Sequence, residues 1–184
     1  IFMTIIFWFT LIQLFGVLAL PLSLILFRFL PDRGYILAKP LGLLFSSYIV
    51  WLCASLQWIA FSRLSIMLSI FLLASLSTTL ILTKKIDLLN YIKKNIKVIS
   101  IGESIFFLSF AFFILLRSAN PDLWHPYIGG EKSMEMAHIN AIVKSTYMPP
   151  YDPWFSGGYI NYYYFGHFIA AYFIRLTGTL PEVG

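Results

Sequence analysis

Residues 120–176 read NPDLWHPYIGGEKSMEMAHINAIVKSTYMPPYDPWFSGGYINYYYFGHFIAAYFIRL, the only long stretch of this chain that is not simply apolar. Nearly all residues able to do chemistry lie between its Pro121 and His167. The chain before it consists of apolar runs separated by short basic links. This order predicts a set of membrane-spanning helices that hold one polar segment at the membrane surface.

The composition places the chain among membrane proteins. Of its 184 residues, 59% are hydrophobic and 11% are charged, and the mean hydropathy is +0.81. Soluble domains carry roughly 25% charged residues. The net charge of +5 comes from Lys and Arg in short links between apolar runs, the pattern that sets topology in membranes. We therefore expect membrane lipids as partners and no nucleic acid.

The apolar runs predict an all-α polytopic membrane protein with about five transmembrane helices, at about 20 residues per crossing. The predicted spans are Ile1–Leu30, Leu41–Phe61, Leu64–Thr83, Val98–Leu116 and Ile160–Leu176. Ser and Thr in the third span are expected to hydrogen-bond neighbouring helices. The fifth span is short, so we expect the Pro- and Gly-rich segment 149–158 before it to fold against it.

Two basic links predict the orientation in the membrane. Arg28–Lys39 and Lys84–Lys97 together hold eight Lys or Arg, and the positive-inside rule puts both in the cytoplasm. In the second link, three apolar residues share one face while lysines take the rest, which predicts an interfacial helix. The loop 117–158 then lies on the outer face of the cell membrane, and Arg175 returns to the cytoplasm.

The chain divides into two parts. Residues 1–100 hold the N-terminal spans and the basic cytoplasmic linker, and residues 98–184 hold a span, the outer loop 117–158 and the span 160–176. Residue 1 is not Met and the chain stops without a terminal feature, so we interpret it as an N-terminal part of a longer protein. Glu103, inside the fourth span, either belongs to a site or pairs with the basic interface.

Within the outer loop, residues 131–144 predict an amphipathic surface helix. Glu131, Glu135 and His138 are spaced i, i+4 and i+7 and therefore share one polar face. Glu131 either complements the helix dipole or acts as an acid/base group at the membrane–water boundary. Glu135 and His138 also match the Glu-x-x-His spacing of carboxylate-bridged metal sites, but the sequence has no second copy, so we predict no metal site.

Aromatic residues predict where a substrate contacts the loop. Asp152 lies in the stiff segment 148–158, which must lie outside hydrocarbon or be buried in protein. Tyr162, Tyr163 and Tyr164 follow. Tyrosines there are either ordinary interfacial residues or contacts to sugar and phosphate groups. His167, one turn further, is either a buried hydrogen-bonded residue or part of the same pocket.

Three motifs carry a resemblance to a known family. The segments GGYINYYYFGHF, MPPYDPWFSGG and LPDRGYILAKPLGL closely resemble those of the YYY-domain integral membrane proteins. The resemblance covers residues 31–184. Members are several hundred residues long, which agrees with the interpretation of this chain as a fragment.

A second resemblance is to the GT-C glycosyltransferases. A span, an acidic residue soon after it, a surface helix, a Pro-Pro element and a Tyr-Tyr pair opening the next span form their layout. The resemblance implies a polyprenyl-phosphate sugar donor and a glycan or protein acceptor on the outer face. It implies Glu131 as catalytic base, with Asp122 second, although the usual adjacent acidic pair is here Glu131–Lys132. A divalent metal ion stays open.

The same resemblance implies a set of substrate-binding residues. Lys132 or Arg117 would pair with the donor phosphate, and the tyrosine run would line the pocket. The full expected set is Arg117, Lys132, Glu135, His138, Asp152, Tyr162, Tyr163, Tyr164 and His167. The competing class is a non-enzymatic membrane protein, either a transporter or an assembly scaffold. A transporter should carry polar residues or broken helices near the bilayer midplane, whereas the polar groups here gather at the outer boundary.

Overall fold

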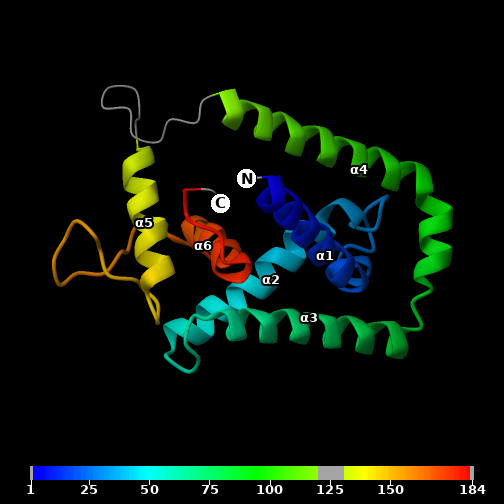
Figure 1. Cartoon of the computed structure of the whole chain (residues 1–184). Helices are drawn as coiled ribbons and strands as arrows, with labels where there is room; N and C mark the ends of the chain where they lie inside the picture. Colours follow the sequence, from blue (N-terminus) through cyan, green and yellow to red (C-terminus); the bar gives the residue numbers. More distant parts are fainter. Residues whose placement is uncertain (1, 120–130, 183–184) are drawn as a thin grey trace.

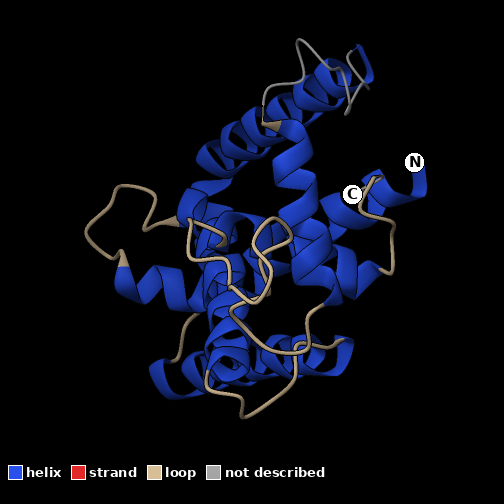
Figure 2. Ribbon diagram, turned by 90° about the vertical axis from the view of Figure 1, so that its left-hand side faces the viewer, coloured by secondary structure: helices blue, strands red, loops and turns tan. Residues whose placement is uncertain are grey.

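A computed structural model describes residues 2–119 and 131–182, and these residues form an all-helical fold (Figure 2). The helices are α1 (Phe2–Leu26), α2 (Tyr35–Ser55), α3 (Arg63–Lys84), α4 (Leu88–Ala119), α5 (Lys132–Lys144) and α6 (Phe165–Thr177). Within the described ranges the only β pairing is a single bridge between Tyr151 and Tyr159. The predicted all-α class is confirmed.

Helices α1 to α4 are each long and apolar enough to cross a membrane. Their lengths of 25, 21, 22 and 32 residues compare with about 20 residues for one crossing. Asn95 departs from helical geometry and divides α4 into a short first part and a long second part, which run in different directions (Figure 1). The first part corresponds to the predicted interfacial helix, and the second to the predicted fourth span.

The described helices define two ends of the molecule (Figure 1). We call the end where α3 begins, and across which α5 lies, the α5 end. The opposite end holds the links 27–34 and 85–95, and we call it the basic end. The two predicted basic links thus lie together, at the far side of the spans from the predicted surface helix.

Close helix contacts build the bundle of α1, α2 and α3. A side chain at Gly42 would clash with the backbone carbonyl oxygen of Phe15, so a small residue is needed where α2 crosses α1. Ser77 of α3 donates a hydrogen bond to the Leu18 carbonyl of α1. The predicted interhelical role of serines is confirmed here and at Ser69, whose hydroxyl lies 2.7 Å from that of Ser46 on α2.

The fifth predicted crossing is the main correction. Helix α6 has 13 residues, about 20 Å of helix against a hydrocarbon core of about 30 Å. The Arg175 guanidinium donates to the carbonyls of Phe61 (3.2 Å) and Ser145 (3.3 Å), both at the α5 end. The prediction that Arg175 lies across the spans from the loop 117–158, beside the basic links, is therefore wrong. Both ends of α6 lie near the α5 end, because residues 159–160 are taken up by hairpin pairing and leave too few for a crossing.

Helix α2 begins six residues before the predicted span, which started after Pro40. The carboxylate of Asp32 explains the early start, since it accepts hydrogen bonds from the backbone N–H groups of Gly34 (3.0 Å) and Ile36 (3.1 Å). These are first-turn donors that a helix otherwise leaves without partners. Pro40 consequently lies inside α2 rather than at its start.

A polar cluster inside the spans ties α4 to α1 and α2. The Glu103 carboxylate accepts hydrogen bonds from Gln13 Nε2 (2.9 Å), the Tyr35 hydroxyl (2.7 Å) and Lys39 Nζ (2.6 Å). The Lys39 ammonium also lies 4.0 Å from the centre of the Phe106 ring. Most side chains of α4 are otherwise exposed, so this cluster, which we call the Glu103 clamp, is one of its few polar attachments to the bundle. Glu103 thus pairs with a lysine inside α2 rather than with the basic interface near Lys97.

The clamp leads to a stability prediction. Glu103→Leu leaves the Lys39 ammonium without its counter-ion among apolar helices, which typically costs about 3 kcal/mol or more. The double change Lys39→Leu/Glu103→Leu removes both charges and should be less destabilised than Glu103→Leu alone. Thermal unfolding of the purified protein in lipid nanodiscs measures both.

Ser104→Leu, at the next and exposed position of α4, is the matched control and should leave the unfolding temperature nearly unchanged. Equal unfolding temperatures for Glu103→Leu and Ser104→Leu would contradict the clamp.

Candidate functional site

Two histidines meet where α5 packs on α6. The rings of His138 and His167 are 5.6 Å apart between centroids and nearly perpendicular. His138 is only 5% exposed. The Nδ1 atom of each ring is buried and has no hydrogen-bond partner among the described residues. A buried polar atom without a partner costs free energy, so this pair is an unusual feature of the α5–α6 interface.

The acidic side of α5 continues from this pair toward water. Glu135 and Glu131 are exposed, and the charge of Glu135 acts on the His167 ring. Glu131 directly precedes α5, and its side chain makes no capping hydrogen bond. The predicted common face of Glu131, Glu135 and His138 thus runs from solvent into the α5–α6 interface.

Tyr162 and Tyr163 stand beside this acidic face. Their rings stack at 4.1 Å, and 50% and 76% of the two side chains are exposed. A hydrogen bond to Tyr163, the charge of that tyrosine, partial burial and the charge of Glu131 together raise the pKa of Tyr162. We call Glu131, Glu135, His138, Tyr162, Tyr163 and His167 the acid–histidine cluster.

The two predicted phosphate-binding residues also come together. Arg117 at the end of α4 and Lys132 at the start of α5 line one cavity of about 170 Å³, with Glu135 and Glu182. The guanidinium and ammonium groups therefore approach the acid–histidine cluster from its α4 side. Asp122, the second predicted base, lies outside the described residues.

Two predicted substrate-binding residues also have structural contacts, and one of them, Asp152, lines a cleft as well. The Tyr164 hydroxyl accepts a hydrogen bond from Trp51 Nε1 at 2.8 Å, which fixes the start of α6 against α2. Asp152 Oδ1 accepts from the backbone N–H groups of Trp154 (2.8 Å) and Phe155 (3.3 Å), so it holds a turn. Three consecutive tyrosines thus divide into one bound to the bundle and two that face outward.

Residues 150–160 form a hairpin between α5 and α6. Its base packs on the bundle, since Met148, Pro150 and Ile160 are all buried. Its tip extends beyond α5, on the side away from α1 to α3 (Figure 1), and Trp154 and Phe155 there are 68% and 69% exposed. We expected this segment to fold against the following helix. The base of the hairpin does pack on the bundle, but its tip does not.

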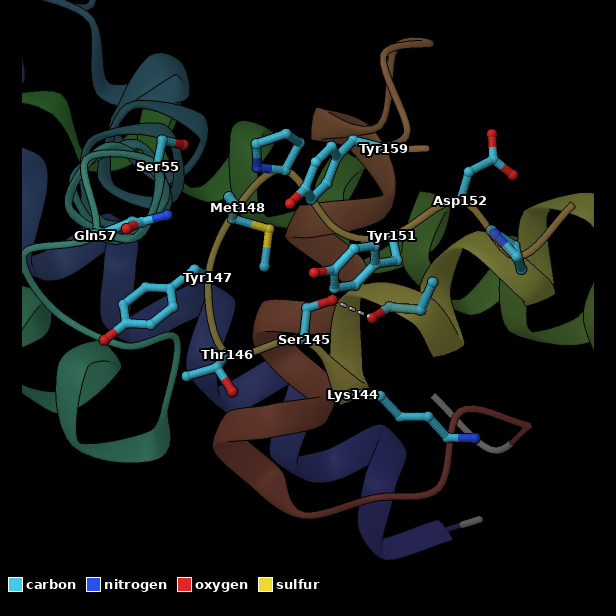
Figure 3. Close-up of a pocket in the computed structure, with 13 residues that line it drawn as sticks. Ser55, Gln57, Lys144, Ser145, Thr146, Tyr147, Met148, Tyr151, Asp152 and Tyr159 are labelled. Atoms are coloured by element: carbon cyan, nitrogen blue, oxygen red, sulfur yellow. Dashed lines mark hydrogen bonds between the residues drawn. The ribbon is translucent and has the colours of Figure 1, made fainter. Parts of the chain in front are cut away.

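A cleft of about 720 Å³ opens between this hairpin, the end of α2 and the end of α5 (Figure 3). We call it the hairpin cleft. Tyr151 and Tyr159 stack at 4.8 Å on its hairpin side. A hydrogen bond to Tyr151, the charge of that residue and slight burial raise the pKa of Tyr159. Sequence reasoning missed this cleft, although the two tyrosines that flank the Pro153–Gly158 turn are a visible signal for it.

A resident metal ion finds no ligand set in the described part of the chain. No group of three or more His, Cys, Asp or Glu there is arranged to hold one. His138 and His167 meet, but the residues around them do not complete a coordination sphere.

Comparison with known families gives the class. Residues 45–184 match the family described as uncharacterized membrane protein (DUF2298). Because the match covers more than half of the chain, the chain belongs to this family of membrane proteins. Neither the curated proteins nor the solved structures compared with the chain give a match. The family agrees with the four long apolar helices and with a multi-pass membrane protein.

The role of Asp152 gives a testable prediction. Asp152→Ala removes the acceptor of two turn N–H groups, which is worth about 1 kcal/mol. The amides of Trp154 and Phe155 should then exchange with deuterium several-fold faster, as measured by mass spectrometry of hairpin peptides. Asp152→Asn keeps an oxygen at the same place and should exchange almost as slowly as the native hairpin. Unchanged exchange in Asp152→Ala would show that the carboxylate does not hold the turn.

Proposed function

We propose that this chain is part of a membrane glycosyltransferase that moves a sugar from a polyprenyl-phosphate donor to an acceptor on the outer face of the cell membrane. The observation that carries the proposal is the acid–histidine cluster. It contains a carboxylate that makes no capping hydrogen bond to α5, two imidazoles whose buried Nδ1 atoms have no partner among the described residues, and a pair of stacked phenol rings. These groups come from segments 24 to 36 residues apart in the sequence, such as Glu131 and His167.

The position of the cluster supports a lipid-linked substrate. It lies at the α5 end, where the long apolar helices end and the polar segments begin (Figure 1). A polyprenyl chain can remain in the bilayer while its phosphate and sugar reach this boundary. Arg117 and Lys132 line the cavity beside the cluster, and their cationic groups suit a phosphate.

The proposed reaction needs one base and one anion site. Glu131 takes the proton of an acceptor hydroxyl, whose oxygen attacks the anomeric carbon of the donor sugar. The bond between that carbon and the phosphate oxygen breaks, and polyprenyl phosphate leaves with the electron pair. Arg117 and Lys132 stabilise the charge that develops on this phosphate. The His138 and His167 nitrogens and the outward tyrosines orient sugar hydroxyls.

One observation favours a second function, transport. The Glu103 clamp places a carboxylate and an ammonium inside the spans, and intramembrane charges often mark ion or substrate paths. However, all three hydrogen-bond partners of Glu103 belong to the protein, and they tie three helices together. The clamp is therefore better accounted for as an attachment of α4 than as a substrate path.

A deletion strain and two variants test the proposal. Loss of the gene that encodes this chain should make a polyprenyl-phosphate sugar accumulate, and the native gene should restore the normal level, as measured by mass spectrometry of extracted lipids. Glu131→Gln keeps the size of the side chain but cannot accept the proton. General-base catalysis typically contributes about 10²–10⁴-fold, so Glu131→Gln should leave the donor accumulated.

Asp87→Asn is the control, because it makes the same carboxylate-to-amide change at an exposed position of the basic end, outside the acid–histidine cluster. It should restore the normal donor level at equal protein abundance in the membrane. If Glu131→Gln restores the normal donor level, Glu131 is not the base. If no lipid-linked sugar accumulates in the deletion strain, the proposed function is wrong.

A further inference from the structure

The hairpin cleft lies at the other end of α5 from the proposed base. Lys144, the last residue of α5, lines the cleft, while Glu131 directly precedes the first residue. A 13-residue helix spans about 20 Å. The cleft is therefore separate from the acid–histidine cluster, and the reaction steps described above make no use of it.

The lining of the cleft alternates aromatic and polar side chains. Three tyrosines supply ring faces and hydroxyl groups, namely Tyr147, Tyr151 and Tyr159. Ser55 and Gln57 at the end of α2 add a hydroxyl and an amide from the opposite side (Figure 3). Sites with an apolar lining and a few convergent polar groups are typical of small-molecule recognition, and a volume of about 720 Å³ is in the range of such sites.

The chemistry of the lining selects among ligand classes. Among the described residues that line the cleft, Lys144 is the one cation. A polyphosphate or a nucleic acid needs several cations, so neither suits this cleft. An acyl chain would need a continuous apolar wall, and Ser55, Gln57 and Asp152 interrupt it. A pyranose ring has apolar C–H faces and a rim of hydroxyl groups, which match tyrosine faces, amides and hydroxyls at once.

The direction of the hairpin separates this aromatic surface from a membrane belt. Interfacial aromatics lie at the level where spans leave the hydrocarbon. Here the hairpin tip extends past α5, away from α1 to α3, so its aromatic residues project into water if the long helices cross the membrane (Figure 1). The cleft tyrosines at the base of the same hairpin therefore need another explanation than membrane anchoring.

We propose that the hairpin cleft binds a neutral oligosaccharide, as the acceptor subsite of the proposed glycosyltransferase. That the saccharide is an acceptor rests on the proposed function. That the cleft binds a saccharide rests on the cleft alone. Because the cleft and Glu131 are about 20 Å apart along α5, one sugar unit cannot occupy both. The acceptor is then a chain of several sugar units, held in the cleft by one part and extended at Glu131 by its end.

Binding is tested without any donor. The full-length protein in zwitterionic lipid nanodiscs is titrated with a panel of neutral trisaccharides that differ in hexose and linkage, and affinity is measured by calorimetry and saturation-transfer NMR. At least one trisaccharide should bind. Tyr151→Ala removes a ring face from the cleft and should weaken that binding tenfold or more. Tyr147→Ala removes a second ring outside the hairpin and should weaken it also, which excludes loss of hairpin folding as the cause.

Trp154→Ala is the matched control, since Trp154 is an equally exposed aromatic residue of the same hairpin that does not line the cleft. It should bind as the native protein does. Glu131→Gln should also bind normally while it fails to transfer, so the two proposals can fail separately. No binding of any trisaccharide in the panel, or equal weakening by Trp154→Ala, overturns the saccharide subsite.

Discussion

The buried hydroxyl of Tyr172 determines where the α5 end of the molecule is built. It lies 2.6 Å from the Ser46 hydroxyl of α2 and 3.4 Å from the Ser69 hydroxyl of α3, and none of the three side chains is more than 3% exposed. An unpaired hydroxyl among apolar helices costs free energy, so these groups have to meet. These hydrogen bonds attach α6 to α2 and α3. Helix α5 packs on α6, and this packing brings the rings of His138 and His167 together.

The pattern of apolar runs predicted the spans well, because length and hydropathy are what a bilayer selects. The surface helix at 131–144 followed from its spacing of apolar and acidic residues. The position of α6 could not be predicted in the same way, since its composition resembles that of a span. What excludes a crossing is the length of only 13 residues left to α6, together with the binding of Arg175 to the carbonyls of Phe61 and Ser145, segments distant in sequence.

The candidate site divides similarly. Glu131, Glu135 and His138 were predicted together because helical spacing puts them on one face, and the structure brings His167 and Tyr162, predicted separately as substrate contacts, next to them. Tyr164 and Asp152 were predicted as substrate contacts, and the structure adds a structural role for each, through Trp51 and through the hairpin backbone, while Asp152 also lines the hairpin cleft. The hairpin cleft was not predicted, since its lining combines α2, α5 and a loop. Local patterns indicate which residues share a face, and tertiary contacts decide which remain available.

The proposed function requires that the α5 end faces the outside while the basic end faces the cytoplasm. Single cysteines at Ser133→Cys and Asn90→Cys test it most directly, in a cysteine-free full-length protein that includes Cys53→Ala. Both positions are exposed, one in α5 and one in the first part of α4. In intact cells a membrane-impermeant thiol reagent should label Ser133→Cys and should label Asn90→Cys only after the membrane is opened. Labelling of Asn90→Cys alone in intact cells would contradict the account.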